Sequence, residues 1–201
     1  MIKVYKNFHY YCYIPNNFNP EGGNALHITM HGAGTRGTDR EVLSNGVLTG
    51  QLERGLELPC VVVAPQCEAE TWFDVFEQLQ DFIGGMIEEY KVDPAKVYLS
   101  GNSMGGYCCW QLLITMPKTF ARALICCGGG MYWNAGIIKT PVRAFHGALD
   151  RVVFVEESIK MCNAVNRSDG KAELTVYYDL EHDCWTRAFN NPDNLKWISG
   201  Q

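Results

Sequence analysis

Three residues of this sequence, Ser103, Asp150 and His182, have the side chains that nucleophilic catalysis by a serine requires. A serine hydroxyl is a weak nucleophile at neutral pH unless an imidazole accepts its proton. The imidazole in turn needs a carboxylate on its other nitrogen, which selects the ring tautomer and stabilises the imidazolium that forms. Serine, then aspartate, then histidine is one of the chain orders in which such triads occur.

Ser103 lies in a segment whose pattern suits a nucleophile. Residues 101–105 read Gly-Asn-Ser-Met-Gly, a G-x-S-x-G match. The apolar run Val97–Leu99 predicts a short buried strand before it, and residues 104–116 predict a helix that Pro117 ends. Flanking glycines are needed because a side chain there would collide with the neighbouring strand and helix. The pentapeptide alone also occurs in ordinary glycine-rich turns, and the strand and helix around it favour the catalytic interpretation.

His182 is the histidine whose position best fits a general base. It follows both the serine and the aspartate, and it lies in a loop after the last predicted strand. His9 belongs to an N-terminal edge segment, and His27 lies in the middle of a strand, where a structural role is commoner. His31 and His146 each precede a glycine at a strand end, which favours a role in organising a loop.

Asp150 is the preferred carboxylate because it directly follows a predicted strand. Asp179 and Asp183 are rivals, but both are so close to His182 in sequence that reaching the far side of its ring is awkward. Two further aspartates lie at predicted helix ends, where helix capping explains them, namely Asp74 and Asp93.

A glycine-rich segment after an earlier strand could supply backbone donors to an oxyanion. It reads His31-Gly32-Ala33-Gly34. Glycines on both sides of a small residue free the backbone to direct an N–H group at developing negative charge. We expect the Ala33 N–H, or alternatively that of Gly34, to act with the Met104 N–H at the start of the helix after Ser103.

The elements that must position these residues alternate between strand and helix along the whole chain. This alternation predicts an α/β fold with a mostly parallel sheet flanked by helices, as one domain over residues 1–201. The candidate residues all lie just past the carboxyl ends of strands, where such sheets bind ligands. Strands are expected at 25–30, 60–64, 97–99, 121–126, 142–145 and 174–178, with one or two edge strands in 2–15. Helices are expected at 74–90, 104–116, 155–165 and from about 184, the last broken at 190–192.

The composition indicates a soluble globular protein. The 201 residues are 47% hydrophobic, and the net charge of −5 with a pI near 5.5 argues against nucleic-acid binding. No apolar window is long enough to span a membrane, and the N-terminus lacks the apolar region of a signal peptide. Nine cysteines, an odd number without a C-x-x-C motif, favour reduced thiols in a cytoplasm, and metal-binding spacing is lacking.

Five segments together resemble the α/β-hydrolase superfamily. They are GNSMGGYCCW, MHGAGTRG, VAPQC followed by Trp72, HGALDRVV, and EHDCWTRAF with a later WI. More narrowly, they are similar to its small phospholipase/carboxylesterase or "predicted peptidase" branch, related to dienelactone hydrolases and feruloyl esterases. The resemblance covers roughly residues 25–201. It implies an ester-cleaving serine hydrolase without metal or organic cofactor, with these roles: Ser103 nucleophile, Asp150 acid, His182 base, and the Ala33 and Met104 amides as oxyanion hole.

The resemblance also suggests pocket residues and one departure. Gln66 and Trp72 match a P-Q-C…W stretch near the site in the family, and relatives usually have a glycine where this chain has Glu181. Only residues 128–140 lie where many esterases insert a cap, so we expect a minimal cap or none. The expected site is an open cleft for short-chain or aromatic acyl groups, walled by Trp72 and by Tyr132 and Trp133.

The leading functional hypothesis is therefore a cytoplasmic carboxylesterase that forms an acyl-enzyme. A peptidase, amidase or thioesterase could use the same triad. A thiol mechanism through Cys67 or Cys184 is a further alternative. A non-catalytic binding protein is disfavoured, because no triad member is lost. The expected partner is a small-molecule ester, and the expected state is a monomer or homodimer.

Overall fold

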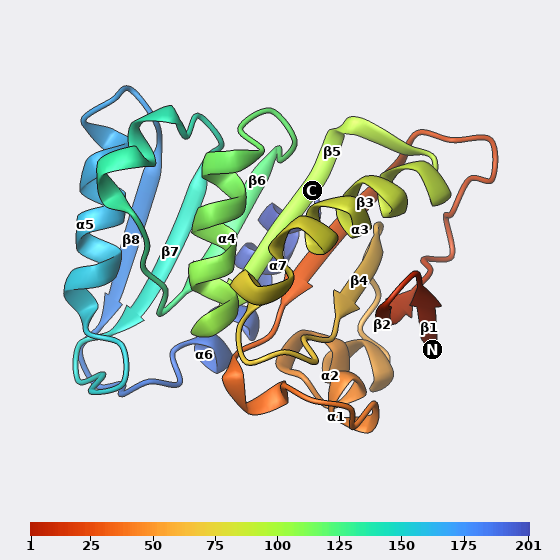
Figure 1. Cartoon of the computed structure of the whole chain (residues 1–201), viewed down its shortest axis with the longest axis horizontal. Coiled ribbons are helices and arrows are strands. Elements are labelled where there is room, and N and C mark those ends of the chain that lie inside the picture. The colour runs from red at the N-terminus through yellow and green to blue at the C-terminus, as the bar shows by residue number, and fades with distance from the viewer.

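A single eight-stranded sheet organises the protein in a computed structural model that describes residues 1–201 (Figure 1). The spatial order is β1-β2-β4-β3-β5-β6-β7-β8. Strands β3 to β8 pair in parallel, and β2 is antiparallel to both β1 and β4. The strands are β1 (Ile2–Tyr5), β2 (Phe8–Tyr13), β3 (Asn24–Met30), β4 (Val61–Pro65), β5 (Val92–Asn102), β6 (Arg122–Cys126), β7 (Val142–Gly147) and β8 (Ala172–Tyr177).

Helices cover both faces of the sheet. Helices α3, α4 and α5 lie on one face, α6 and α7 lie on the other, and α1 and α2 lie near the carboxyl ends of β3 and β4 (Figure 1). The prediction of an α/β fold with a mostly parallel sheet is confirmed. The helices are α1 (Glu41–Ser44), α2 (Val47–Glu53), α3 (Phe76–Glu89), α4 (Met104–Thr115), α5 (Val155–Asn166), α6 (Trp185–Phe189) and α7 (Pro192–Ile198), with 3₁₀ helices η1 (Ala33–Thr35), η2 (Trp72–Val75) and η3 (Tyr132–Ile137).

Alternation along β5 divides the core into two parts. Val97 and Leu99 pack with α3 and α4, while Tyr98 packs on the opposite face with α7. Because successive side chains of a strand point to opposite faces, Ser100 and Asn102 share the face of Tyr98. The sheet therefore directs polar groups of β5 toward the face that α2, α6 and α7 cover.

Two predicted helices are divided where capping residues interrupt them. Asp74 and Thr71 form a capping box, in which the Thr71 N–H donates to the Asp74 carboxylate over 2.8 Å, so η2 precedes α3. The Asn191 side chain accepts from the Asp193 N–H over 2.9 Å and begins α7 at Pro192. Proline at the first helical position costs no hydrogen bond, which explains why the break predicted at 190–192 lies there.

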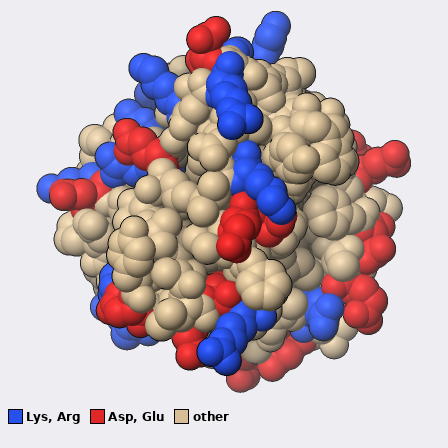
Figure 2. Space-filling view, turned by 90° about the vertical axis from the view of Figure 1, so that its left-hand side faces the viewer, with Lys and Arg blue, Asp and Glu red and all other residues tan.

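The segment between β6 and β7 forms no separate layer. Its 3₁₀ helix η3 packs against α5, and α1 and α2 flank the site instead (Figure 1). No helix combines the length and the apolar character needed to cross a bilayer. On the face that carries α5 and the edge strand β8, Lys and Arg side chains are interspersed with Asp and Glu (Figure 2). Such a face has no broad basic surface.

Candidate active site

Ser103 lies in a strained turn between β5 and α4. Its φ of 53° and ψ of −119° place a non-glycine residue at positive φ. The Ser103 N–H donates to the Cys126 carbonyl over 3.0 Å, which ties the turn to the end of β6. A Cβ at Gly101 would lie 2.6 Å from the Gly105 oxygen, and one at Gly105 would overlap the Met30 carbonyl. Both glycines are therefore required by close packing, as the sequence pattern predicts.

The structure brings Ser103, His182 and Asp150 into one hydrogen-bonded line. The Ser103 Oγ lies 2.9 Å from His182 Nε2, and His182 Nδ1 lies 2.7 Å from Asp150 Oδ2. The other carboxylate oxygen of Asp150 accepts the N–H groups of Val152 and Val153 over 2.8 and 2.9 Å. With Asp150 ionised, His182 Nδ1 carries the proton, and Nε2 is free to accept one from the serine.

The surroundings of Asp150 hold this carboxyl group in its ionised form. Burial raises its pKa, but hydrogen bonds from His182 and from the N–H groups of Val153 and Val152 lower it more. The pKa of Asp150 therefore lies below its ordinary value. The side chains of Asp150 and His146 are both inaccessible to solvent, and His146 Nε2 lies 3.3 Å from the Asp150 Oδ2.

The two rival aspartates have other structural roles. Asp183 caps α6 by accepting the N–H of Thr186 over 3.0 Å and its hydroxyl over 2.8 Å. Asp179 forms a two-bond ion pair with Arg187 on the surface. Glu181, where relatives usually have glycine, does not have positive φ, and its side chain is exposed. A side chain is therefore accommodated before His182.

The loop after β3 lies beside the serine. A Cβ at Gly32 would lie 3.4 Å from the Ser103 Cβ and 2.9 Å from the Asn102 side-chain nitrogen, so glycine permits the close approach. Ala33 begins η1 and Met104 begins α4. The first N–H groups of a helix have no intrahelical acceptor, so both are available to a ligand. The positions suit the oxyanion role expected from the sequence.

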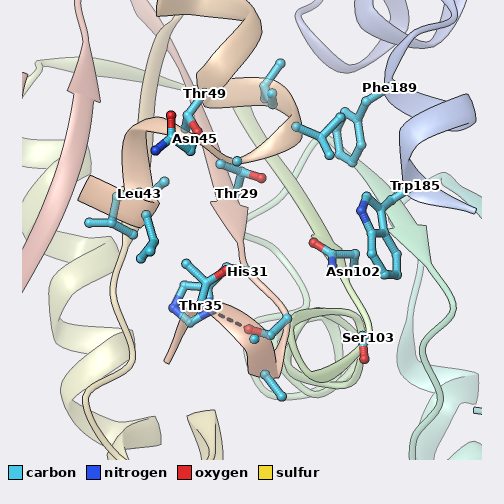
Figure 3. A pocket seen from close by; sticks show the side chains of 18 of the residues that line it. Thr29, His31, Thr35, Leu43, Asn45, Thr49, Asn102, Ser103, Trp185 and Phe189 are labelled. Carbon is cyan, nitrogen blue, oxygen red and sulfur yellow. Dashed lines mark hydrogen bonds between the residues drawn. The ribbon is translucent and has the colours of Figure 1, made fainter. Parts of the chain in front are cut away.

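Hydrogen bonds of His31 hold this loop in place. The Cys67 N–H donates to His31 Nε2 over 3.0 Å, so the ring proton is on Nδ1, which donates to the Gly32 carbonyl over 2.7 Å (Figure 3). The Trp72 indole N–H donates to the His31 carbonyl over 3.1 Å. Two of these bonds join the loop to the segment after β4 and to η2, and the bond to Gly32 lies within the loop. His31 thus organises a loop, as its position before a glycine indicates.

The four residues expected to contact substrate do not line the cavity beside Ser103. Trp72 is fully buried beneath His31, and Gln66 is buried, donating to the carbonyls of Thr35 and Asp39. Both hold the loop in place from the protein interior. Tyr132 and Trp133 are exposed on η3, which packs against α5 away from Ser103. The expectation is corrected because η3 folds onto the helix layer instead of over the strand ends.

The cavity that opens at Ser103 has a volume of about 540 Å³. It extends across the sheet face between α1, α2 and α6, and its wall includes Leu48, Trp185 and Phe189 (Figure 3). Sequence reasoning missed these residues, although Trp185 lies in one of the motifs. The cavity contains no Lys, Arg, Asp or Glu; its only titratable lining side chains are those of His31 and His182.

A family model for phospholipase/carboxylesterase proteins matches residues 63–194, more than half of the chain. The matched segment contains the serine, the aspartate and the histidine of the hydrogen-bonded line. The chain belongs to the phospholipase/carboxylesterase family. No curated protein sequence matches it.

Solved structures show the same fold as this member of the phospholipase/carboxylesterase family. A thermostable esterase is 27% identical with a TM-score of 0.83; the match covers all of this chain but only 62% of that one. An esterase from Thermogutta terrifontis is 17% identical with a TM-score of 0.71, covering 98% of this chain and 87% of the other. Esterase PE8 is 18% identical with a TM-score of 0.69, covering 93% and 94%.

One group of side chains near the site has donor atoms that a metal could use. The Cys127 thiol, Asp150 and His182 offer atoms within 4.8 Å of one another. A metal ion there would replace the bond between Asp150 and His182 that directs the ring at Ser103. Burial also raises the pKa of the Cys127 thiol, whereas a metal ligand must be a thiolate. The geometry in this phospholipase/carboxylesterase family member therefore suits a hydrogen-bonded triad better than a metal centre.

The two cysteines considered as alternative nucleophiles are both buried and lie outside the lining of the cavity. The Cys67 thiol donates to the Ala69 carbonyl over 3.5 Å, and burial raises its pKa. The Cys184 thiol donates to the Phe145 carbonyl over 3.4 Å. Neither is placed to attack a substrate in the cavity.

The buried ring of His31 predicts a measurable pH dependence of stability. Burial lowers the pKa of His31 to about 4, whereas an unfolded histidine titrates near 6.5. Between pH 7 and pH 5 the unfolded chain takes up a proton that the folded chain does not, so the folded state loses stability as pH falls. We expect His31 to contribute about 2 kcal/mol of that loss.

Urea unfolding at pH 7 and pH 5 measures the change in free energy, and nitrogen NMR of the ring follows its protonation. In His31→Gln, the fall in the free energy of unfolding from pH 7 to pH 5 should be smaller than in the wild type by about 2 kcal/mol. A His31 ring that titrates near pH 6.5 in the folded protein would contradict the prediction.

Proposed function

We propose that this protein is a cytoplasmic, single-domain carboxylesterase that cleaves esters of short-chain or aromatic acids through an acyl-enzyme. One observation supports this most strongly: the hydrogen-bonded line from Ser103 through His182 to Asp150 opens directly into a neutral cavity. Nucleophile, base and orienting carboxylate are each within hydrogen-bond reach of the next, which is the geometric requirement of this chemistry.

In the first half of the reaction, the Ser103 oxygen attacks the ester carbonyl as its proton passes to His182 Nε2. The carbonyl oxygen becomes negatively charged and accepts hydrogen bonds from the Ala33 and Met104 N–H groups. Asp150 stabilises the imidazolium through the 2.7 Å bond to Nδ1. The imidazolium then gives its proton to the alcohol oxygen, the carbon–oxygen bond breaks, and the acyl group remains on Ser103.

In the second half, water enters the position that the alcohol has left. His182 accepts a proton from the water, the resulting hydroxide attacks the acyl carbonyl, and the proton returns to Ser103 as the acid is released. The strained backbone at Ser103 and the His31 bonds hold the participating groups in place before substrate arrives. No step requires a metal or an organic cofactor.

The size and the charge of the cavity favour a substrate with a neutral acyl group of modest size. Its volume of about 540 Å³ lies in the range of small-molecule sites, and it has no charged group to balance a carboxylate or an ammonium in the acyl chain. The nine buried, unpaired cysteines fit a reducing compartment. Peptidases, amidases and thioesterases use the same triad, so the substrate panel below includes an amide and a thioester.

A matched panel of substrates tests the proposal. Hydrolysis of 4-nitrophenyl acetate, butyrate and octanoate, of methyl ferulate, of the butyryl thioester of N-acetylcysteamine and of the 4-nitroanilide of butyrate is measured with the same protein. We expect the oxygen esters to give kcat/KM at least a hundredfold above the anilide, because an amine leaving group is poorer. A higher kcat/KM for the anilide than for the oxygen esters would show an amidase. A higher kcat/KM for the thioester would show a thioesterase.

A further inference from the structure

The cavity beside Ser103 has polar side chains among its apolar lining, and the proposed chemistry makes no use of them. Thr29, Thr49 and Asn102 line the same space together with Trp185 and Phe189 (Figure 3). A pocket for a plain alkyl chain would be apolar throughout, because each buried polar group without a partner destabilises the complex. The polar side chains therefore need an explanation in the ligand.

Thr29 is the last member of a buried hydrogen-bonded chain. His27 Nε2 lies 2.7 Å from the Ser100 Oγ, and the Ser100 hydroxyl donates to the Thr29 Oγ1 over 3.0 Å. Because Ser100 gives its only proton to Thr29, the His27 nitrogen must donate to Ser100. Burial lowers the pKa of His27 to about 3, so the ring stays neutral. The Thr29 proton is then free to be donated into the cavity.

Thr49 supplies a second, independent observation. It lines the cavity from α2 and is only 3% exposed, yet its hydroxyl has no hydrogen-bond partner in the protein. Buried polar atoms are nearly always paired, so an unpaired hydroxyl at a cavity wall indicates a ligand that completes it. The Thr49 oxygen is itself inaccessible to solvent, so it serves a ligand in the cavity only after the side chain rotates about its Cα–Cβ bond.

We propose that Thr29, together with Thr49, forms a subsite for a neutral oxygen atom on the acyl chain of the substrate. This rests on the proposed ester hydrolysis and narrows its substrate class to acids with an ether, hydroxyl or keto oxygen remote from the scissile carbonyl. The oxygen is neutral because no cationic side chain lines the cavity. The acyl group is placed beside Thr29 because the alcohol must leave the site before water enters.

The register of the sheet sets the reach of the subsite. Thr29 pairs with Ser100, and Ser103 follows three residues later, in the turn directly after β5. At about 3.3 Å per residue this is roughly 10 Å, and subtracting one hydrogen bond leaves about 7 Å between carbonyl and oxygen. When the carbonyl carbon is counted as the first atom, an oxygen at the sixth position of the acyl chain meets this distance. An oxygen at the fourth position does not.

Three esters with acyl chains of equal length test the subsite. They are the 4-nitrophenyl esters of heptanoic, 5-methoxypentanoic and 3-propoxypropanoic acids, which have no oxygen, a sixth-atom oxygen and a fourth-atom oxygen. In an apolar pocket either oxygen lowers kcat/KM, because it loses its water without gaining a partner. We expect the methoxy ester to equal or exceed the heptanoate, and the propoxy ester to be several-fold poorer than the methoxy ester.

Variants of Thr29 identify the partner. In Thr29→Val, which keeps the shape, the ratio of kcat/KM for the methoxy ester to that for the heptanoate should fall about tenfold. Thr29→Ser keeps the hydroxyl and should restore the ratio to within about threefold. Thr175→Val, at an exposed position of the edge strand β8, is the matched control and should leave the ratio unchanged.

The outcomes separate this proposal from the esterase proposal. 4-Nitrophenyl acetate is too short to reach Thr29, so its hydrolysis reports the triad alone. Failure to hydrolyse any ester would refute the esterase proposal and the subsite with it. Hydrolysis of acetate with a methoxy-to-heptanoate ratio that is the same in Thr29→Val and wild type would refute the subsite only. A fall in the ratio that Thr29→Ser does not repair would also refute it.

Discussion

Replacing Ser103 with alanine should lower kcat for 4-nitrophenyl acetate by a factor on the order of 10⁵–10⁶, the scale at which removal of a serine nucleophile acts. The fold should persist, because the Ser103 hydroxyl bonds only to His182. The backbone at φ 53° therefore does not depend on that hydroxyl. A fluorophosphonate should add one equivalent to the wild-type protein: the Ser103 oxygen bonds to phosphorus, the phosphorus–fluorine bond breaks, and fluoride leaves. Intact-protein mass spectrometry detects the adduct.

The control for this prediction is Ser168→Ala, in the loop between α5 and β8, which should be labelled and active like the wild type. Undiminished labelling of Ser103→Ala would place the nucleophile elsewhere. Loss of activity with iodoacetamide but not with the fluorophosphonate would indicate a thiol mechanism instead. The burial of Cys67 and Cys184 makes us expect little effect of iodoacetamide on the native protein.

Replacing Asp150 with asparagine should lower kcat by a factor on the order of 10³–10⁴. The asparagine amide would donate to His182 Nδ1, which leaves the ring proton on Nε2, facing Ser103, so the ring could not accept the proton of the serine. The side chain is of similar size, and its oxygen can still accept the Val152 and Val153 N–H groups. Steady-state kinetics on the acetate, with circular dichroism to confirm folding, measures the effect.

Asp183→Asn is the matched comparison, because it removes a neighbouring negative charge by the same substitution. Asparagine caps a helix about as well as aspartate, so α6 should persist. We expect kcat to change less than tenfold. A larger loss in Asp183→Asn than in Asp150→Asn would assign the orienting carboxylate to Asp183 and would require a different conformation of the loop after β8.

The hydrogen-bonded line could be anticipated from the sequence because its members follow separate strands of one parallel sheet. Ser103, Asp150 and His182 come after β5, β7 and β8, and the carboxyl ends of parallel strands share one edge. The Gly-x-Ser-x-Gly spacing further restricts the backbone to a turn that only small flanking residues allow. Local pattern and sheet topology together therefore predict which residues meet, whereas their bond lengths come from the structure.

The lining of the cavity could not be anticipated in the same way. Trp72 and Trp133 have aromatic side chains that suit a pocket, yet one is buried under His31 and the other is exposed on η3. Which face an aromatic residue presents depends on the packing of its segment against distant elements. The short, weakly patterned helices α1 and α2 flank the cavity because Leu43, Leu48 and Leu52 pack into the core beside β4.

The sequence by itself determined the α/β alternation, the nucleophile turn and the order of the three residues, since hydrophobic period, glycine spacing and chain order are local properties. Tertiary structure alone decided that Thr29 ends a buried chain from His27, that Thr49 lacks a partner, and that both line one cavity. Those facts depend on the register between β3 and β5 and on where α2 docks. Register and docking are set by the summed packing of many remote side chains, which no single stretch of sequence contains.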